Sequence, residues 1–252
     1  MAEWAPLADA GYAFATAALF MFVGRKAGRP DAQGSDLLAL SMFRVWWLGV
    51  AIFLFIGGLL SLLDGQGLAG GPLGFSVAVL SMLAVCVAVW GLVFYVTYLY
   101  TGKTKSFLLG LTFYAVIFGG MVFALASDAT GMELAAWHQS VVRLAILTGP
   151  LLSGIIVAFL IPALVALAGY AGLYRRVKSP AQRFRLGLSI GSLIIWFGLA
   201  ILAWAGGFAD SLPWVYLGRL LALAAALGVL IAYRPPRWVA QRLQLVPEAA
   251  AA

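Results

Sequence analysis

Seven long apolar segments, separated by short polar stretches, constrain this chain more than any other feature of its sequence. An α-helix needs about 20 apolar residues to cross the hydrocarbon core of a bilayer, so seven such helices would use about 140–160 residues. The chain has 252 residues, which leaves little for a separate soluble domain. The segments that we expect to span a membrane are 9–24, 37–63, 73–100, 106–126, 144–174, 186–206 and 212–233.

The composition supports the same interpretation. Hydrophobic residues make up 64% of the chain and charged residues only 10%, whereas charged residues make up about 25% of an ordinary soluble domain. This balance excludes a soluble globular enzyme. We therefore predict an all-α integral membrane protein, a single seven-helix bundle over residues 1–252. Pro150 and Pro162 lie inside the fifth segment and predict a kink there.

Basic residues gather in alternate polar stretches. Cytoplasmic loops of membrane proteins carry an excess of Lys and Arg, so seven spans predict an N-terminus outside and a C-terminus in the cytoplasm, in the inner (plasma) membrane of a bacterium. The net charge of +7 is then explained by topology and does not indicate nucleic-acid binding. The acidic residues of the other stretches are Glu3, Asp9, Asp64, Asp128, Glu133 and Asp210. The basic residues are Arg25, Lys26, Arg29, Lys103, Lys105, Arg175, Arg176, Lys178, Arg183, Arg185, Arg234, Arg237 and Arg242.

The densest group of basic residues follows the fifth segment. We expect it to attract anionic lipid, with about 1 kcal/mol for each basic residue near the surface. The alternative is a docking site for a cytoplasmic protein partner. This cytoplasmic basic cluster consists of Arg175, Arg176, Lys178, Arg183 and Arg185.

The residues that catalysis or metal binding would need are scarce. Cys86 is the one cysteine and His138 the one histidine, so neither a cysteine metal site nor a set of histidine ligands can form. Ser140 is too close to His138 in sequence for the two to converge on a helix, and no Gly-x-Ser-x-Gly motif occurs. We predict no catalytic residue, no metal and no enzymatic activity. Carboxylates are missing from the middle of every segment, which counts against ion-coupled transport.

Arg219 is the most informative charged residue. It follows Pro213 by six positions, which places it about 9 Å into the seventh segment. An arginine at this depth is costly unless it is paired, faces water or extends to the membrane surface. One hypothesis is that Arg219 faces an outward-open pocket and binds an anionic or carbonyl-bearing ligand. The alternative is snorkelling, or an ion pair with an outer carboxylate, for which the candidates are Asp64, Asp128, Glu133 and Asp210.

Three aromatic residues complete the candidate ligand site. Trp90 and Trp196 lie deep in the third and sixth segments, and Tyr216 lies one turn before Arg219. Deep aromatic side chains can line a ligand cavity or fill the core of the bundle. Both interpretations remain open for these residues.

The predicted topology resembles the microbial rhodopsins and the seven-helix sensory modules at the N-terminus of some bacterial histidine kinases. The rhodopsin family implies a retinal bound to a lysine of the seventh segment. That segment instead contains Tyr216-Leu-Gly-Arg219, and all lysines lie in loops. Covalent retinal is therefore excluded and no cofactor is expected. The resemblance to sensory modules implies a receptor-like function, with any output supplied by a separate protein.

Three functions follow as hypotheses. The first is a receptor-like protein that binds a small apolar or weakly anionic ligand non-covalently from the outer side. The second is a transporter or channel for a small solute or lipid, which would need a continuous polar path through the bundle. The third is a structural subunit of a membrane complex. The sequence does not identify the ligand, the partner or the oligomeric state.

Overall fold

The computed structural model describes residues 5–26, 34–68, 71–128, 159–198 and 212–242. No residue in these ranges belongs to a β-strand, and long helices account for most of them. The helices are α1 (Ala5–Lys26), α2 (Gly34–Gly65), α3 (Gly71–Thr101), α4 (Ser106–Asp128), α7 (Ile161–Arg176), α8 (Pro180–Leu193), the π-helical turn η2 (Ile194–Gly198), α10 (Leu212–Tyr233) and α11 (Arg237–Arg242).

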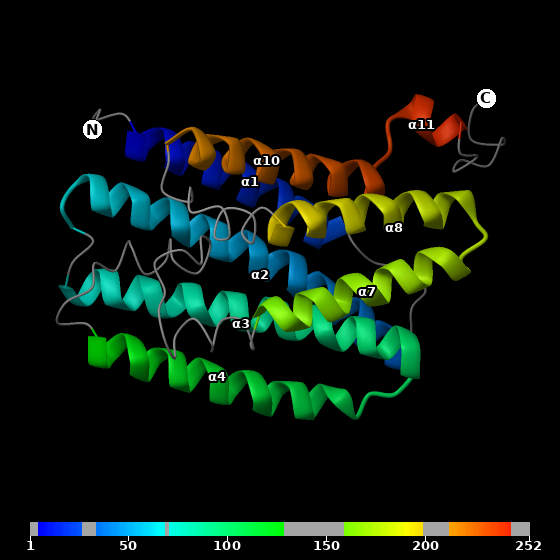
Figure 1. Cartoon of the computed structure of the whole chain (residues 1–252), viewed down its shortest axis with the longest axis horizontal. Coiled ribbons are helices and arrows are strands. Elements are labelled where there is room, and N and C mark those ends of the chain that lie inside the picture. Colours follow the sequence, from blue (N-terminus) through cyan, green and yellow to red (C-terminus); the bar gives the residue numbers. More distant parts are fainter. Residues whose placement is uncertain (1–4, 27–33, 69–70, 129–158, 199–211, 243–252) are drawn as a thin grey trace.

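The long helices lie side by side with their axes nearly aligned (Figure 1). Following the packing contacts, α1 packs on α2, α2 on α3, α3 on α7, α7 on α8, α8 on α10, and α10 again on α1. These six helices therefore form a closed ring within the described part of the chain. Helix α4 packs on the outside of this ring, against α3.

Five of the described helices are long and apolar enough to cross a membrane. The spanning stretches lie in α1, α2, α3, α4 and α10, and they match the first four predicted segments and the seventh to within a few residues. The helical class is thus confirmed for the described residues, and five of the predicted segments form helices with the length and apolar composition that a membrane span needs. The fifth and sixth predicted segments lie partly outside the described residues. Pro162 is the second residue of α7, which follows directly on π-helical residues 159–160, and Pro150 lies outside the described residues.

All basic loop residues of the described chain lie at one end of the bundle, which we call the basic end. It contains the end of α1, the start of α2, the α3–α4 and α7–α8 connections, and α11 (Figure 1). Arg29 lies outside the described residues. One boundary differs from the prediction, because α8 starts at Pro180 and not near residue 186. Proline favours the first position of a helix, so Arg183 and Arg185 belong to the first turns of α8 and not to a loop.

Glycines allow α2 and α3 to approach closely. A Cβ atom on Gly49 would lie 2.7 Å from the Cβ of Ala88, and one on Gly91 would lie 2.6 Å from the carbonyl oxygen of Met42. Small residues at helix contacts permit such close packing, which supplies much of the attraction between helices in lipid. Alongside this contact lies a layer of aromatic side chains, in which Phe43 packs on Trp47 and Tyr95.

Two glycines end helices in left-handed conformations. Gly67 has φ 69°, and the N–H of Leu68 donates to the carbonyl of Leu63 at 2.8 Å, as in a Schellman cap. Gly102 has φ 63°, and its own N–H donates to the carbonyl of Tyr98 at 2.8 Å. These caps satisfy backbone carbonyls that would otherwise be unpaired, and they turn the chain back into α3 and α4.

Candidate functional site

A cavity of about 360 Å³ opens at the basic end of the ring, among α2, α3, α7, α8 and α10. This volume is near the lower end of the range for small-molecule sites, about 300–1,000 Å³. Its apolar wall comes mainly from α2, α3 and the two helices of the α7–α8 hairpin, and consists of Leu40, Phe43, Leu99, Leu173, Val177 and Leu186. Its polar groups belong to Tyr95, Tyr170, Gln182, Arg185, Ser189 and Tyr233.

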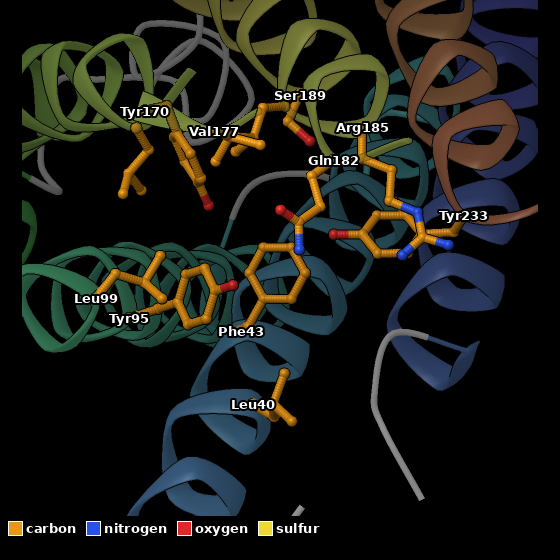
Figure 2. A pocket seen from close by; sticks show the side chains of 12 residues that line it. Leu40, Phe43, Tyr95, Leu99, Tyr170, Val177, Gln182, Arg185, Ser189 and Tyr233 are labelled. Carbon is orange, nitrogen blue, oxygen red and sulfur yellow. The ribbon is translucent and has the colours of Figure 1, made fainter. Parts of the chain in front are cut away.

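Three tyrosines converge on this space from three different helices. Figure 2 shows the hydroxyl groups of Tyr95, Tyr170 and Tyr233 turned toward the interior, with the amide of Gln182 extending between them. Tyr95 and Tyr170 each lie six residues before the end of a helix that runs toward the basic end. The two tyrosines therefore lie at about the same depth below the basic end. Tyr233 is the last residue of α10, and its ring lies 5.9 Å from that of Phe43.

Two of the hydroxyl groups that line the cavity belong to residues that are largely buried. The side chains of Tyr170 and Ser189 are 4% and 6% exposed, and neither forms a hydrogen bond with any residue in the described ranges. Because both hydroxyls face the open space, neither is a fully buried polar atom without a partner; among the described residues, the side-chain atoms of that kind are Trp47 Nε1 and Ser106 Oγ. A bound molecule with acceptor atoms could accept hydrogen bonds from both groups at the wall of the cavity.

Gln182, Arg185 and Leu99 are exposed and form the mouth of the cavity, while Phe43 and Tyr170 are buried within it. Gln182 and Arg185 also form no hydrogen bond or ion pair with described residues. The cavity is therefore open toward the basic end, with a charged mouth and an aromatic interior.

Arg219 lies at the opposite end of the bundle, in an ion pair. Its Nε donates to Asp9 Oδ1 at 2.6 Å and its Nη2 donates to Asp9 Oδ2 at 3.1 Å. The hydroxyl of Ser61 donates to the same Oδ2 at 2.7 Å. Both charged side chains are 19% exposed. The network joins α10, α1 and α2, and it occupies guanidinium donors that the sequence analysis assigned to a ligand.

The partner is an outer carboxylate, but it is Asp9 and not one of the four candidates predicted from the sequence. Asp9 is the fifth residue of α1, about 6 Å along that helix, and α1 and α10 run in the same direction side by side. Because α1 starts at Ala5, Asp9 lies inside this helix and not at its beginning. The side chains of Asp64, Asp128, Glu133 and Asp210 lie outside the described part of the structure.

Among the other predicted site residues, Trp90 lies away from Arg219. Trp90 lies between α3 and α4, where its Nε1 donates to the carbonyl of Phe107 at 3.2 Å and its ring lies against Gly110. Tyr216 is half-buried on α10. The side chain of Trp196 lies outside the described residues. Trp90 thus packs in a different helix interface from the Arg219 network, and neither residue lines the cavity.

The cytoplasmic basic cluster surrounds the α7–α8 connection, and part of it is held by local contacts. The Nε of Arg183 donates to the carbonyl of Val177 at 2.6 Å, and its guanidinium lies 6.0 Å from the ring centre of Tyr174. Arg176 lies 5.9 Å from the ring centre of Tyr100. Arg185 is the member of the cluster that lines the cavity. The cluster is therefore partly a structural feature of the hairpin and partly the mouth of the cavity.

The sequence matches no protein-family model, and no curated protein or solved structure shows significant similarity to it. The resemblance to sensory modules and rhodopsins therefore stays a prediction.

Proposed function

We propose that this chain is a receptor-like seven-helix membrane protein that binds a small amphipathic molecule non-covalently in the cavity at its basic end. The cavity itself is the observation that carries this proposal, because it brings the hydroxyls of Tyr170 and Ser189 and the guanidinium of Arg185 around one open space with apolar walls. The apolar walls and the small volume suit a compact ligand that carries both an apolar body and acceptor atoms.

The proposed orientation places the basic end in the cytoplasm, because Lys and Arg concentrate on the cytoplasmic side of membrane proteins. The directions of α1, α2, α3, α4, α7, α8 and α10 are consistent with seven spans and an external N-terminus. The ligand would then enter from the cytoplasm or the inner leaflet. This replaces the expectation of an outward-open site, since Arg219 already has a partner in Asp9.

A receptor-like role is supported by the number of helices that meet at the cavity. The lining residues come from α2, α3, α7, α8 and α10. A ligand changes a conformational equilibrium only to the extent that it binds one state better than another. The affinity of a ligand that contacts five helices depends on the relative positions of those helices. The α7–α8 hairpin beside the cavity carries the basic residues that a cytoplasmic partner would contact.

The experiment is native mass spectrometry of the full chain, gently purified from its membrane, with two matched variants. Val177→Trp places a large ring at the cavity, whereas Val116→Trp places the same ring on α4, where Val116 is 69% exposed. We expect an adduct of defined mass on the wild type and on Val116→Trp, and its loss from Val177→Trp. Tyr170→Phe, which removes one hydroxyl, should weaken retention without filling the cavity.

The proposal is wrong if all of these proteins retain the same mixture of bulk lipids. A single co-purifying protein in that case would instead favour the structural-subunit hypothesis.

A further inference from the structure

The polar side of the cavity contains one cation and several side chains that can donate hydrogen bonds. Arg185, Gln182 and Ser189 come from α8, and Tyr233 comes from the neighbouring α10. None of the lining residues is Asp or Glu. A guanidinium offers only donors, and a carboxylate or phosphate offers only acceptors in its ionised form. Because the one charged group is a guanidinium and no carboxylate lines the cavity, the lining favours an anion over a cation.

The guanidinium of Arg185 has hydrogen-bond donors that no described residue accepts from. Its neighbour Arg183 is fixed by the Val177 carbonyl and the Tyr174 ring, but Arg185 forms no hydrogen bond or ion pair with residues that the structure describes. Figure 2 shows its guanidinium beside Tyr233. An arginine in this position can bind an oxyanion with two parallel hydrogen bonds.

The opposite side of the cavity is apolar. Leu40 and Phe43 of α2 and Leu99 of α3 face the donors across the open space (Figure 2). We infer that the ligand is a small organic acid, with a carboxylate or phosphate group held by Arg185 and an apolar body against α2 and α3. This inference rests on the proposed function and names the ligand class of the same cavity. The volume suits one compact body rather than the two chains of a phospholipid.

The test uses full-length protein in nanodiscs of zwitterionic phosphatidylcholine and three soluble probes of similar size, namely 3-phenylpropionate, phenyl phosphate and the neutral 3-phenylpropanamide. Dissociation constants are measured by NMR titration. A hydrogen-bonded charge contributes about 1.5–3 kcal/mol, so we expect at least one of the two anions to bind about tenfold or more tightly than the amide. Arg185→Gln should reduce this preference about tenfold.

The matched control is Arg237→Gln, the same charge loss at the same end of the bundle but outside the cavity lining. It should keep the preference for the anion. This result would show that the preference depends on Arg185 itself and not on the total positive charge at this end of the bundle. Equal binding of anions and amide, failure of both anions to bind, or an unchanged preference in Arg185→Gln would overturn the inference. In each of these cases, the proposed function would still be supported if the neutral amide bound to the wild type and Val177→Trp abolished that binding.

A further arm distinguishes a soluble acid from a lipid headgroup as the source of the anion. If the probe is displaced in nanodiscs that contain phosphatidylglycerol, the cavity takes a lipid phosphate and the assignment to a compact acid is wrong. Unchanged probe affinity in those nanodiscs supports a soluble organic acid from the cytoplasm.

Discussion

Removing either charge of the Asp9–Arg219 pair should destabilise the bundle. An exposed ion pair contributes about 0–1 kcal/mol, whereas removing one partner of a buried pair costs about 3–5 kcal/mol. At 19% exposure, with three hydrogen bonds on the carboxylate, this pair lies between the two cases. We expect Asp9→Asn and Arg219→Gln each to lower the free energy of unfolding by about 2 kcal/mol.

The double variant separates a coupled pair from two independent residues. Its two amides can bond to each other, so we expect a total loss of about 2 kcal/mol instead of the sum of about 4. Unfolding in mixed micelles of increasing SDS content, followed by far-UV circular dichroism, measures all three free energies. Arg175→Gln, an exposed arginine at the basic end, should stay within about 0.5 kcal/mol of the wild type. Additive losses in the double variant would refute the reasoning, because the two charges would then not stabilise each other.

The close contact of α2 and α3 and the orientation of the bundle give two further predictions. Gly91→Ala would place a Cβ 2.6 Å from a backbone carbonyl oxygen of α2, so it should lower the free energy of unfolding by about 1–3 kcal/mol in the same assay. The control is Gly119→Ala, whose added Cβ meets nothing within 4 Å among described atoms and should not destabilise the protein. Equal losses in the two variants would contradict the predicted clash between α2 and α3. In membrane vesicles, a cysteine at Ser179 should react with a membrane-impermeant maleimide only from the cytoplasmic side, and one at Gln66 only from outside. Labelling of both positions from one side would disprove the proposed topology.

The candidate site could be predicted from the sequence only in part. Arg219 was recognised as unusual because charge inside an apolar segment is expensive, but its partner depended on where α1 begins and on which helix lies beside α10. The cavity itself was missed. Tyr95 and Tyr170 are ordinary aromatic residues of apolar segments, and their equal distance from the ends of α3 and α7 was the only available signal.

The placement of Trp90 shows the same limit. Depth along a segment follows from counting residues, but the direction of a side chain around the helix axis depends on the neighbour against which it packs. The neighbour of Trp90 is Gly110 of α4, whose missing side chain makes room for the indole. No pattern within the third segment alone contains that information.

The sequence by itself determined that the chain is helical and apolar, roughly where most of its spanning helices begin and end, and that its basic residues share one end. These properties follow from local composition, because a bilayer requires every backbone polar group to be paired within a helix and excludes charge. The ring order of the helices, the Asp9–Arg219 pair and the cavity around Tyr170 were decided only by the tertiary structure. They depend on which helix faces meet, and nearly uniform apolar segments carry little signal about their facing sides.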